Sequence, residues 1–207
     1  MPIMLTSYRA MCLVDTGPLS QKLIWQLLMS PTCAEILCQG PVPTFEGVSK
    51  DVLKKLKKLN FASLKNVDKA FCGKPVDFAS VEDSEFLHNA NILRVSHLSL
   101  IMPRGSHSKA AEIRRSLGGI ERLSYFAPQR VTGSCETRVQ KLVQAVYPVV
   151  SQFLPSRYRE ISVEHLSLAM RLNAELCIPV KSNPGDTHLE VLMYSDCMQV
   201  IGRDDKI

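Results

Sequence analysis

Much of what usually reveals a protein's function is missing from this chain of 207 residues. No run of apolar residues reaches the ~18 that a membrane-spanning helix needs, which excludes that class of membrane protein. The first fifteen residues include Arg9 and Asp15 and no small-residue cleavage site, so they do not predict a signal peptide. We therefore expect an intracellular protein, cytoplasmic or peripheral to a membrane, and not a secreted one.

Paired cysteines are missing too. The chain has seven cysteines, an odd number, and none of them forms a C-x-x-C pair. Such scattered thiols predict reduced, mostly buried cysteines rather than a disulfide framework or a metal site. They are Cys12, Cys33, Cys38, Cys72, Cys135, Cys177 and Cys197.

No established catalytic motif is present: the sequence has no H-E-x-x-H, no G-x-S-x-G and no glycine-rich phosphate loop. A D-T-G triplet starts at Asp15, as around the catalytic aspartate of aspartic proteases, but Pro18 follows it here, which indicates a turn. His97 and His165 lie in apolar runs typical of buried core histidines. Cys135 could pair with His165 as nucleophile and base, which leaves a small cysteine-dependent enzyme as a minor alternative. Otherwise the sequence predicts no enzyme, with no catalytic residue, no cofactor and no metal.

The composition is that of an ordinary globular protein, with 45% hydrophobic and 22% charged residues. The length fits a single domain over residues 1–207. A boundary is possible in the glycine- and proline-rich loop at residues 39–49.

Hydrophobic periodicity predicts the elements of the first half of the chain. Residues 3–14 alternate as a strand does, and Ser20 can cap a helix that runs through Met29. Pro31 suits the first turn of a second, short helix, which Gly40 would end.

The second half is predicted to begin with a strand at residues 91–102, where branched and apolar residues gather. The predictions that follow are a helix at 109–126 with a break at Gly118 and Gly119, a helix from Ser134 that Pro148 ends, a helix or strand at 161–172, and two strands at 174–181 and 188–201 around a turn at 182–186.

This order of strand, helices, strand, helices and hairpin favours an α+β fold over regular β-α-β alternation. We expect a mostly antiparallel sheet, built from both ends of the chain and covered by the mid-chain helices. Two octapeptides resemble each other, VSHLSLIM at 95–102 and VEHLSLAM at 163–170. Their flanking residues do not match, which favours coincidence over an internal duplication.

Positive charge is concentrated in one stretch, residues 50–71. It holds seven lysines against Asp51 and Asp68, a net charge of +5 that equals the net charge of the whole chain. At ~100° per residue its leucines and valines fall on one helical face and most of its lysines on the other. The stretch therefore predicts a basic amphipathic helix, or two helices split near Phe61. The lysines are Lys50, Lys54, Lys55, Lys57, Lys58, Lys65 and Lys69.

A second, weaker basic region covers residues 104–122 and has a net charge of +3. Its candidate binding residues are Arg104, Lys109, Arg114 and Arg115. Together the two regions are the candidate site for an anionic lipid or a nucleic acid. A solvated basic face without any partner is the plainest alternative, although solvated faces usually mix charges of both signs.

The loop GPVPTFEG at 40–47 and the run LKKLKKLNF at 53–61 resemble the matrix proteins of rhabdoviruses, in particular those of lyssaviruses. The order of early strand, apolar helix, Gly/Pro loop, basic segment and late strands is similar as well. The chain departs from that pattern because it begins in a predicted strand and has no P-P-x-Y motif. The resemblance implies a non-enzymatic structural protein of the virion, which self-associates beneath a membrane and binds nucleocapsid.

The leading hypothesis from the sequence is therefore a viral matrix protein. Its basic residues would contact an anionic membrane surface or nucleocapsid RNA, and it would form homo-oligomers. The alternative is a non-specific RNA-binding accessory protein, such as a silencing suppressor, because lysines neutralise phosphates without reading sequence.

Overall fold

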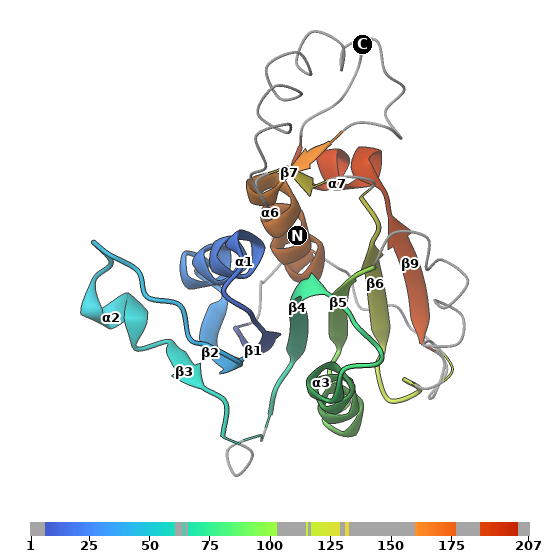
Figure 1. Ribbon diagram of the computed structural model, residues 1–207, viewed down its shortest axis with the longest axis horizontal. Helices are drawn as coiled ribbons and strands as arrows, with labels where there is room; N and C mark the ends of the chain where they lie inside the picture. The colour runs from blue at the N-terminus through green and yellow to red at the C-terminus, as the bar shows by residue number, and fades with distance from the viewer. Residues whose placement is uncertain are drawn as a thin grey trace, which may run out of the picture.

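The computed structural model contains a seven-stranded sheet with helices packed on both faces (Figure 1). It describes residues 7–60, 64, 66–102, 115, 117–128, 131–132, 160–176 and 187–202. The strands lie in the order β3-β2-β1-β4-β5-β6-β9, and each neighbouring pair is parallel. The prediction of a mostly antiparallel α+β sheet is therefore wrong, because the described chain forms a doubly wound α/β sheet.

The strands come from the whole length of the described chain. The large sheet consists of β1 (Tyr8–Leu13), β2 (Cys33–Gln39), β3 (Leu56–Lys58), β4 (Lys69–Pro75), β5 (His97–Ile101), β6 (Arg122–Phe126) and β9 (His188–Leu192). Two short strands, β7 (Val131–Thr132) and β8 (Ile161–Ser162), pair separately in parallel.

The described helices connect or follow these strands. They are α1 (Pro18–Leu28), α2 (Lys50–Leu53), α3 (Val81–Ile92), α6 (Val163–Leu176) and α7 (Tyr194–Val200). Within the described ranges, none of these helices is long and apolar enough to cross a membrane.

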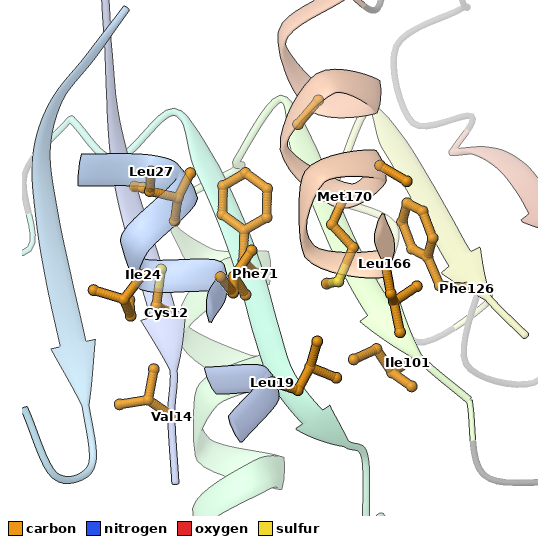
Figure 2. Packing of buried hydrophobic residues seen from close by; sticks show 14 of the residues in the cluster. Cys12, Val14, Leu19, Ile24, Leu27, Phe71, Ile101, Phe126, Leu166 and Met170 are labelled. Carbon is orange, nitrogen blue, oxygen red and sulfur yellow. The ribbon is translucent and has the colours of Figure 1, made fainter. Parts of the chain in front are cut away.

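Two apolar layers enclose the sheet. On one face, Ile24 and Leu27 of α1 and Leu166 and Met170 of α6 pack around Phe71 of β4 (Figure 2). On the other face, α3 packs through Phe86, Leu87 and Ala90. Strands covered on both sides need not alternate between apolar and polar residues. All five residues of β5 are buried, the polar His97 and Ser99 included, because the sheet is covered on both faces.

The first two predicted elements are confirmed. The strand predicted at 3–14 appears as β1 within its described residues, and the helix predicted at 20–29 appears as α1, although Gly17 and not Ser20 is its N-cap. Pro18 stands in the first turn of α1, where its fixed φ angle and missing N–H do no harm. Leu23 and Ile24 lie on the buried face of α1, as the periodicity predicts.

Three later predictions are wrong. The segment after Pro31 forms β2 instead of a short helix, because it is buried between β1 and β3. The basic stretch at 50–71 is not a long helix: it divides into α2, β3 and the start of β4. The end of the helix predicted at 109–126 is the buried strand β6.

The predictions for the C-terminal part of the chain are partly right and partly wrong. Residues 161–172 are helical from Val163 onward, within α6, which extends to Leu176 through the start of the strand predicted at 174–181. The strand predicted at 188–201 is β9 followed by α7, and β9 pairs in parallel with β6. The turn at 182–186 and the helix predicted from Ser134 lie outside the described residues.

Candidate functional site

The strand order places a change of direction between β1 and β4. The chain passes from β1 outward to β2 and β3, then returns to β4 and continues the other way to β5 and β6. In doubly wound sheets, ligands bind outside the carboxyl ends of the strands where this change occurs. We therefore take the carboxyl ends of β1, β2 and β4, with the turns that follow them, as the candidate site, and call it the carboxyl edge.

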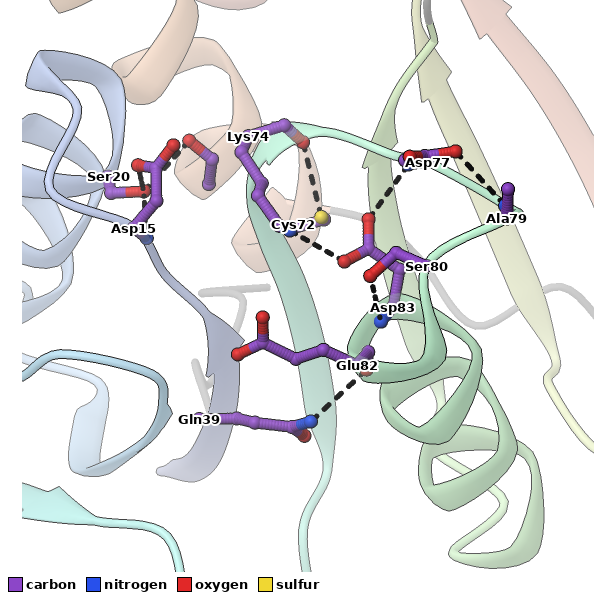
Figure 3. A network of polar contacts seen from close by, with 11 residues as sticks. Asp15, Ser20, Gln39, Cys72, Lys74, Asp77, Ala79, Ser80, Glu82 and Asp83 are labelled. Carbon is purple, nitrogen blue, oxygen red and sulfur yellow. Dashed lines mark hydrogen bonds and ion pairs between the residues drawn. The ribbon is translucent and has the colours of Figure 1, made fainter.

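The turn between β1 and α1 is closed by its own aspartate. The Asp15 carboxylate accepts a hydrogen bond from the backbone N–H of Gly17 at 2.9 Å. It accepts a second one from the Ser20 hydroxyl at 2.7 Å (Figure 3). The backbone N–H of Asp15 donates in turn to Ser20 Oγ at 3.0 Å. Asp15, Gly17 and Ser20 therefore form a compact ring of contacts at the start of the helix.

Ser20 also joins this turn to β4. Its hydroxyl oxygen lies 3.0 Å from the carbonyl oxygen of Gly73. A Cβ atom added to Gly73 would lie 2.8 Å from Ser20 Oγ and 3.0 Å from Ser20 Cα. Helix α1 therefore packs on β4 so closely that Gly73 has no space for a side chain.

A buried ion pair holds the end of β4 against α3. The Lys74 ammonium lies 2.6 Å from Asp83 Oδ1, and the Asp83 side chain has no exposed surface. Asp83 also accepts a hydrogen bond from the backbone N–H of Asp77 at 2.8 Å. Burial alone would lower the pKa of Lys74, but the hydrogen bond to Asp83 and the charges of Asp83 and Glu82 raise it above its ordinary value.

A further contact crosses from β2 to α3. The Gln39 side chain at the end of β2 donates a hydrogen bond to the backbone carbonyl of Glu82 at 3.2 Å (Figure 3). Asp15, Asp77, Glu82 and Asp83 lie at this edge, where the Lys74 ammonium pairs with Asp83 (Figure 3). The described side chains in the turns after β1 and β4 are therefore mainly acidic, although the chain as a whole is basic.

A second polar cluster lies inside the sheet, nearer the amino ends of its strands. His97 Nε2 lies 3.1 Å from the hydroxyls of both Ser99 and Ser124. Ser124 donates to Glu190, which also accepts from Asn173 of α6 at 2.7 Å. Burial, helped by the charge of Lys69, lowers the pKa of His97 to about 3.

Glu190 keeps its charge in this cluster. Burial alone would raise its pKa, but hydrogen bonds from Arg122, Ser124 and Asn173 lower it to about 2. The cluster joins β5, β6, β9 and α6 through hydrogen bonds between their side chains. It confirms the prediction that His97 is a buried, hydrogen-bonded core histidine.

The lysines of the basic stretch are distributed over three elements. Lys50 and Lys54 are exposed on α2, where Lys54 pairs with Asp51 at 2.7 Å. Lys57 and Lys58 are exposed on β3, at one edge of the sheet, and Lys57 pairs with Glu35 of β2 at 2.5 Å. These residues do not lie on one face of one helix.

Two other lysines of the stretch cap helices. Lys55 Nζ donates to the carbonyl of Ser30 at 3.1 Å and to that of Leu28 at 3.4 Å, at the end of α1. Lys69 Nζ donates to the carbonyl of Ala174 near the end of α6. Cations stabilise the negative ends of helix dipoles, so both lysines have a structural role.

The second basic region is described only at its end. Arg115 is exposed. Lys65, Arg104, Lys109 and Arg114 lie outside the described residues, so that anion binding by these side chains stays a prediction.

The described cysteines are free and buried, as predicted: Cys12, Cys33, Cys38, Cys72 and Cys197. Burial raises the pKa of Cys33, Cys38, Cys72 and Cys197 to about 12, and that of Cys12 also rises well above its ordinary value. A thiol that stays protonated is a poor nucleophile. Among the residues that the structure describes, no group of His, Cys, Asp and Glu side chains could hold a metal ion.

Reasoning from the sequence identified the turn at Asp15 but gave it no role. It did not identify Ser20 as more than a helix cap, nor the pair of Lys74 and Asp83. A parallel sheet would have predicted these positions, since Asp15 and Ser20 follow β1 and Lys74 lies near the end of β4, and both strands end at the same edge. The signal was the succession of a strand, a turn and a helix around Asp15.

No family model matches this sequence. No curated protein matches it either.

Solved structures match nearly the whole chain. A putative NAD(P)-dependent gluconate 5-dehydrogenase from Beutenbergia cavernae with bound NADP is 11% identical, with a TM-score of 0.54 over 97% of this chain and 100% of that one. The PhqB reductase domain from Penicillium fellutanum is also 11% identical, with a TM-score of 0.54 over 96% of this chain and 72% of that one. A short chain dehydrogenase/reductase from Saccharomyces cerevisiae is 9% identical, with a TM-score of 0.52 over 92% of this chain and 97% of that one.

These matches overturn the resemblance to rhabdovirus matrix proteins. The predictions of a non-enzymatic structural protein of the virion, of an anionic membrane, nucleocapsid or RNA partner and of matrix-type self-association are wrong as well. These three structures are named as a dehydrogenase, a reductase domain and a dehydrogenase/reductase, and none of the three is a matrix protein. At about a tenth of residues identical, the likeness shows the fold alone, and that fold is Rossmann-like α/β.

Proposed function

We propose that this protein binds a small organic molecule, uncharged or cationic, at the carboxyl edge of its sheet. The observation that carries the proposal is the change of direction between β1 and β4, where doubly wound sheets hold their ligands. The carboxylates of Asp15, Asp77 and Glu82 at this edge favour a cation or a neutral hydrogen-bond donor over an anion.

The fold raises the question of a nicotinamide dinucleotide. Such a cofactor places its pyrophosphate at the start of the first helix, over a turn that contains three glycines. Here the turn has Gly17 alone, with Asp15, Pro18 and Ser20 around it. A carboxylate stands where an anion would bind, so these residues do not fit a dinucleotide pyrophosphate.

Oxidation–reduction with a nicotinamide nucleotide is the second candidate. The observation that favours it is the match to dehydrogenases and reductases, one of them with bound NADP, over nearly the whole chain. This candidate requires that contacts outside the first turn hold the nucleotide.

Titration separates the two candidates. Uniformly labelled protein is titrated with a panel of neutral and cationic fragments and, separately, with NADPH, while amide chemical shifts are recorded. We expect fragments to shift Thr16, Gly17 and Asp77, and NADPH to leave them unchanged. Thr16→Trp, at an exposed position in the turn, should block the fragments, and Met29→Trp at the other end of α1 should not.

Saturable binding of NADPH to the carboxyl edge, with a dissociation constant in the range of about 1 μM to 1 mM usual for enzyme ligands, would establish the second candidate. If neither the fragments nor NADPH perturb the edge, the proposed binding function is wrong.

A further inference from the structure

We infer that Asp15 is an internal anion, which occupies the place at the start of α1 that the phosphates of a nucleotide would need. The inference rests on the proposed function and deepens it. It explains why the carboxyl edge would bind a neutral or cationic molecule and not a nucleotide. It concerns Asp15 and Pro18, together with the contacts that hold Asp15 in place.

The start of a helix attracts anions because its first N–H groups have no partner within the helix. In α1 this capacity is already used. The N–H of Gly17, the N-cap residue, donates to Asp15 Oδ1 at 2.9 Å, and Pro18 at the next position has no N–H. Of the N–H donors that would hold a phosphate, that of Gly17 is thus already bonded to Asp15, and that of residue 18 is absent.

The Asp15 carboxylate is fixed in this position. Ser20 Oγ lies 2.7 Å from Asp15 Oδ1 and also accepts from the Asp15 backbone N–H. Ser20 is itself buried, and Gly73 packs against it. To move aside, the carboxylate would give up its contacts with Gly17 and Ser20.

A phosphate at this helix start would meet a like charge within hydrogen-bond reach of the same donors. Removing one such charge near the surface is expected to tighten phosphate binding by about tenfold. Restoring an N–H at residue 18 should add a further gain, since hydrogen bonds to charged groups are stronger than neutral ones.

The test measures binding of ADP and of inorganic pyrophosphate by titration calorimetry at low salt, with no catalytic assay. Asp15→Asn keeps an oxygen that can accept from Gly17 and Ser20 but removes the charge. We expect it to bind both anions about tenfold more tightly than the wild-type chain. The double variant Asp15→Asn, Pro18→Ala should bind more tightly still.

The matched control is Glu121→Gln, which removes one negative charge at an exposed position just before β6, away from the carboxyl edge. Its affinity for both anions should stay within about twofold of the wild type, because the effect of exposed charges is screened. Circular dichroism melting checks that each variant is folded, and Asp15→Ser replaces Asp15→Asn if the latter does not fold.

The inference is wrong if folded Asp15 variants bind ADP and pyrophosphate no more tightly than Glu121→Gln. This outcome differs from failure of the proposed function, which is shown when the fragments leave the edge of the wild-type chain unperturbed or when NADPH binds there. If Asp15→Asn gains affinity and the wild-type chain binds the fragments but not NADPH, both stand.

Discussion

Buried polar side chains of this protein are paired with residues of other strands and helices. His97 contacts Ser124 across the sheet, and Lys74 contacts Asp83 across a turn. Sequence reasoning could predict that His97 is buried, because apolar residues surround it. It could not name the partners, because strand register decides which side chains meet: Ser99 faces Ser124, which faces Glu190.

The buried His97 predicts a defined pH dependence of stability. Its pKa in the folded protein is about 3, below the ~6.5 of an unfolded chain, because burial and the charge of Lys69 disfavour the imidazolium. The contribution of the neutral ring is complete above about pH 6.5 and is lost as pH falls toward 3. Between about pH 7 and pH 5 this residue alone should cost about 2 kcal/mol of unfolding free energy.

His97→Gln removes that part of the pH dependence. Urea unfolding should show a difference between wild type and variant that shrinks by about 2 kcal/mol from pH 7 to pH 5. The same substitution at the exposed His188, the first residue of β9, is the matched control and should follow the wild type. A constant difference between wild type and His97→Gln would mean that the ring titrates alike in both states.

At the scale of elements, one short motif shows why local patterns are insufficient. The residues His-Leu-Ser-Leu begin β5 at His97, and the same four letters lie inside α6 from His165 onward. In β5 all four residues have sheet partners in β6 and the first three also have partners in β4, whereas α6 lies on the face of the sheet. Tertiary contacts therefore decide whether this motif forms a helix or a strand. Helix α1, in contrast, was predictable because its apolar face and its first turn are encoded locally.

The basic stretch failed as a helix for a related reason. Leu53 and Leu56 have helical spacing, but the edge of β2 offers hydrogen bonds to the segment from Leu56 to Lys58. The N–H of Ile36 donates to the carbonyl of Lys55, and the N–H of Leu59 donates to Cys38, on either side of the paired segment. Pairing with an existing strand thus stabilises β3, and its lysines face solvent at the sheet edge.

That position predicts a role for Lys57 and Lys58 in keeping the edge strand unpaired. Exposed edges invite pairing with a second chain, and lysines on them oppose it by charge and desolvation. The double variant Lys57→Thr, Lys58→Val should therefore self-associate, seen as a sedimentation coefficient that rises with protein concentration.

The control for this edge is Lys50→Thr, Lys54→Val on α2, which lowers the net charge from +5 to +3 just as the edge variant does. It should sediment as the wild type does. Equal association of both double variants would assign the effect to net charge and not to the strand edge.

At the scale of the whole molecule, the sequence predicts a single domain over residues 1–207 with a possible boundary at 39–49. A contact between this loop and α1 supports the single-domain proposal. Phe45, within that loop, lies 5.8 Å from the Trp25 ring of α1, between ring centroids. The parallel order itself could not be predicted, because it depends on crossovers between segments that no local pattern connects.

Helix α6 ties the two halves of the sheet together. Glu175, near its end, accepts hydrogen bonds from Tyr8 of β1 at 2.8 Å and from Thr32 at 3.1 Å, whereas Asn173 contacts Glu190 of β9. Met170, between these contacts and the start of the helix, is fully buried in the core shared with α1. Loss of the packing of α6 should therefore destabilise both halves of the sheet, on either side of β1 and β4.

Cooperative unfolding follows from this arrangement. Met170→Ala should cost about 2–5 kcal/mol, because it leaves a cavity under α6. Its urea midpoint should fall equally in far-ultraviolet circular dichroism, which reports the whole chain, and in the fluorescence of Trp25, the single tryptophan on α1. Ile92→Ala, at an exposed position on α3, should leave both midpoints nearly unchanged. If the tryptophan midpoint stayed at its wild-type value while the dichroism midpoint fell, the two halves would unfold separately and the single-domain proposal would be wrong.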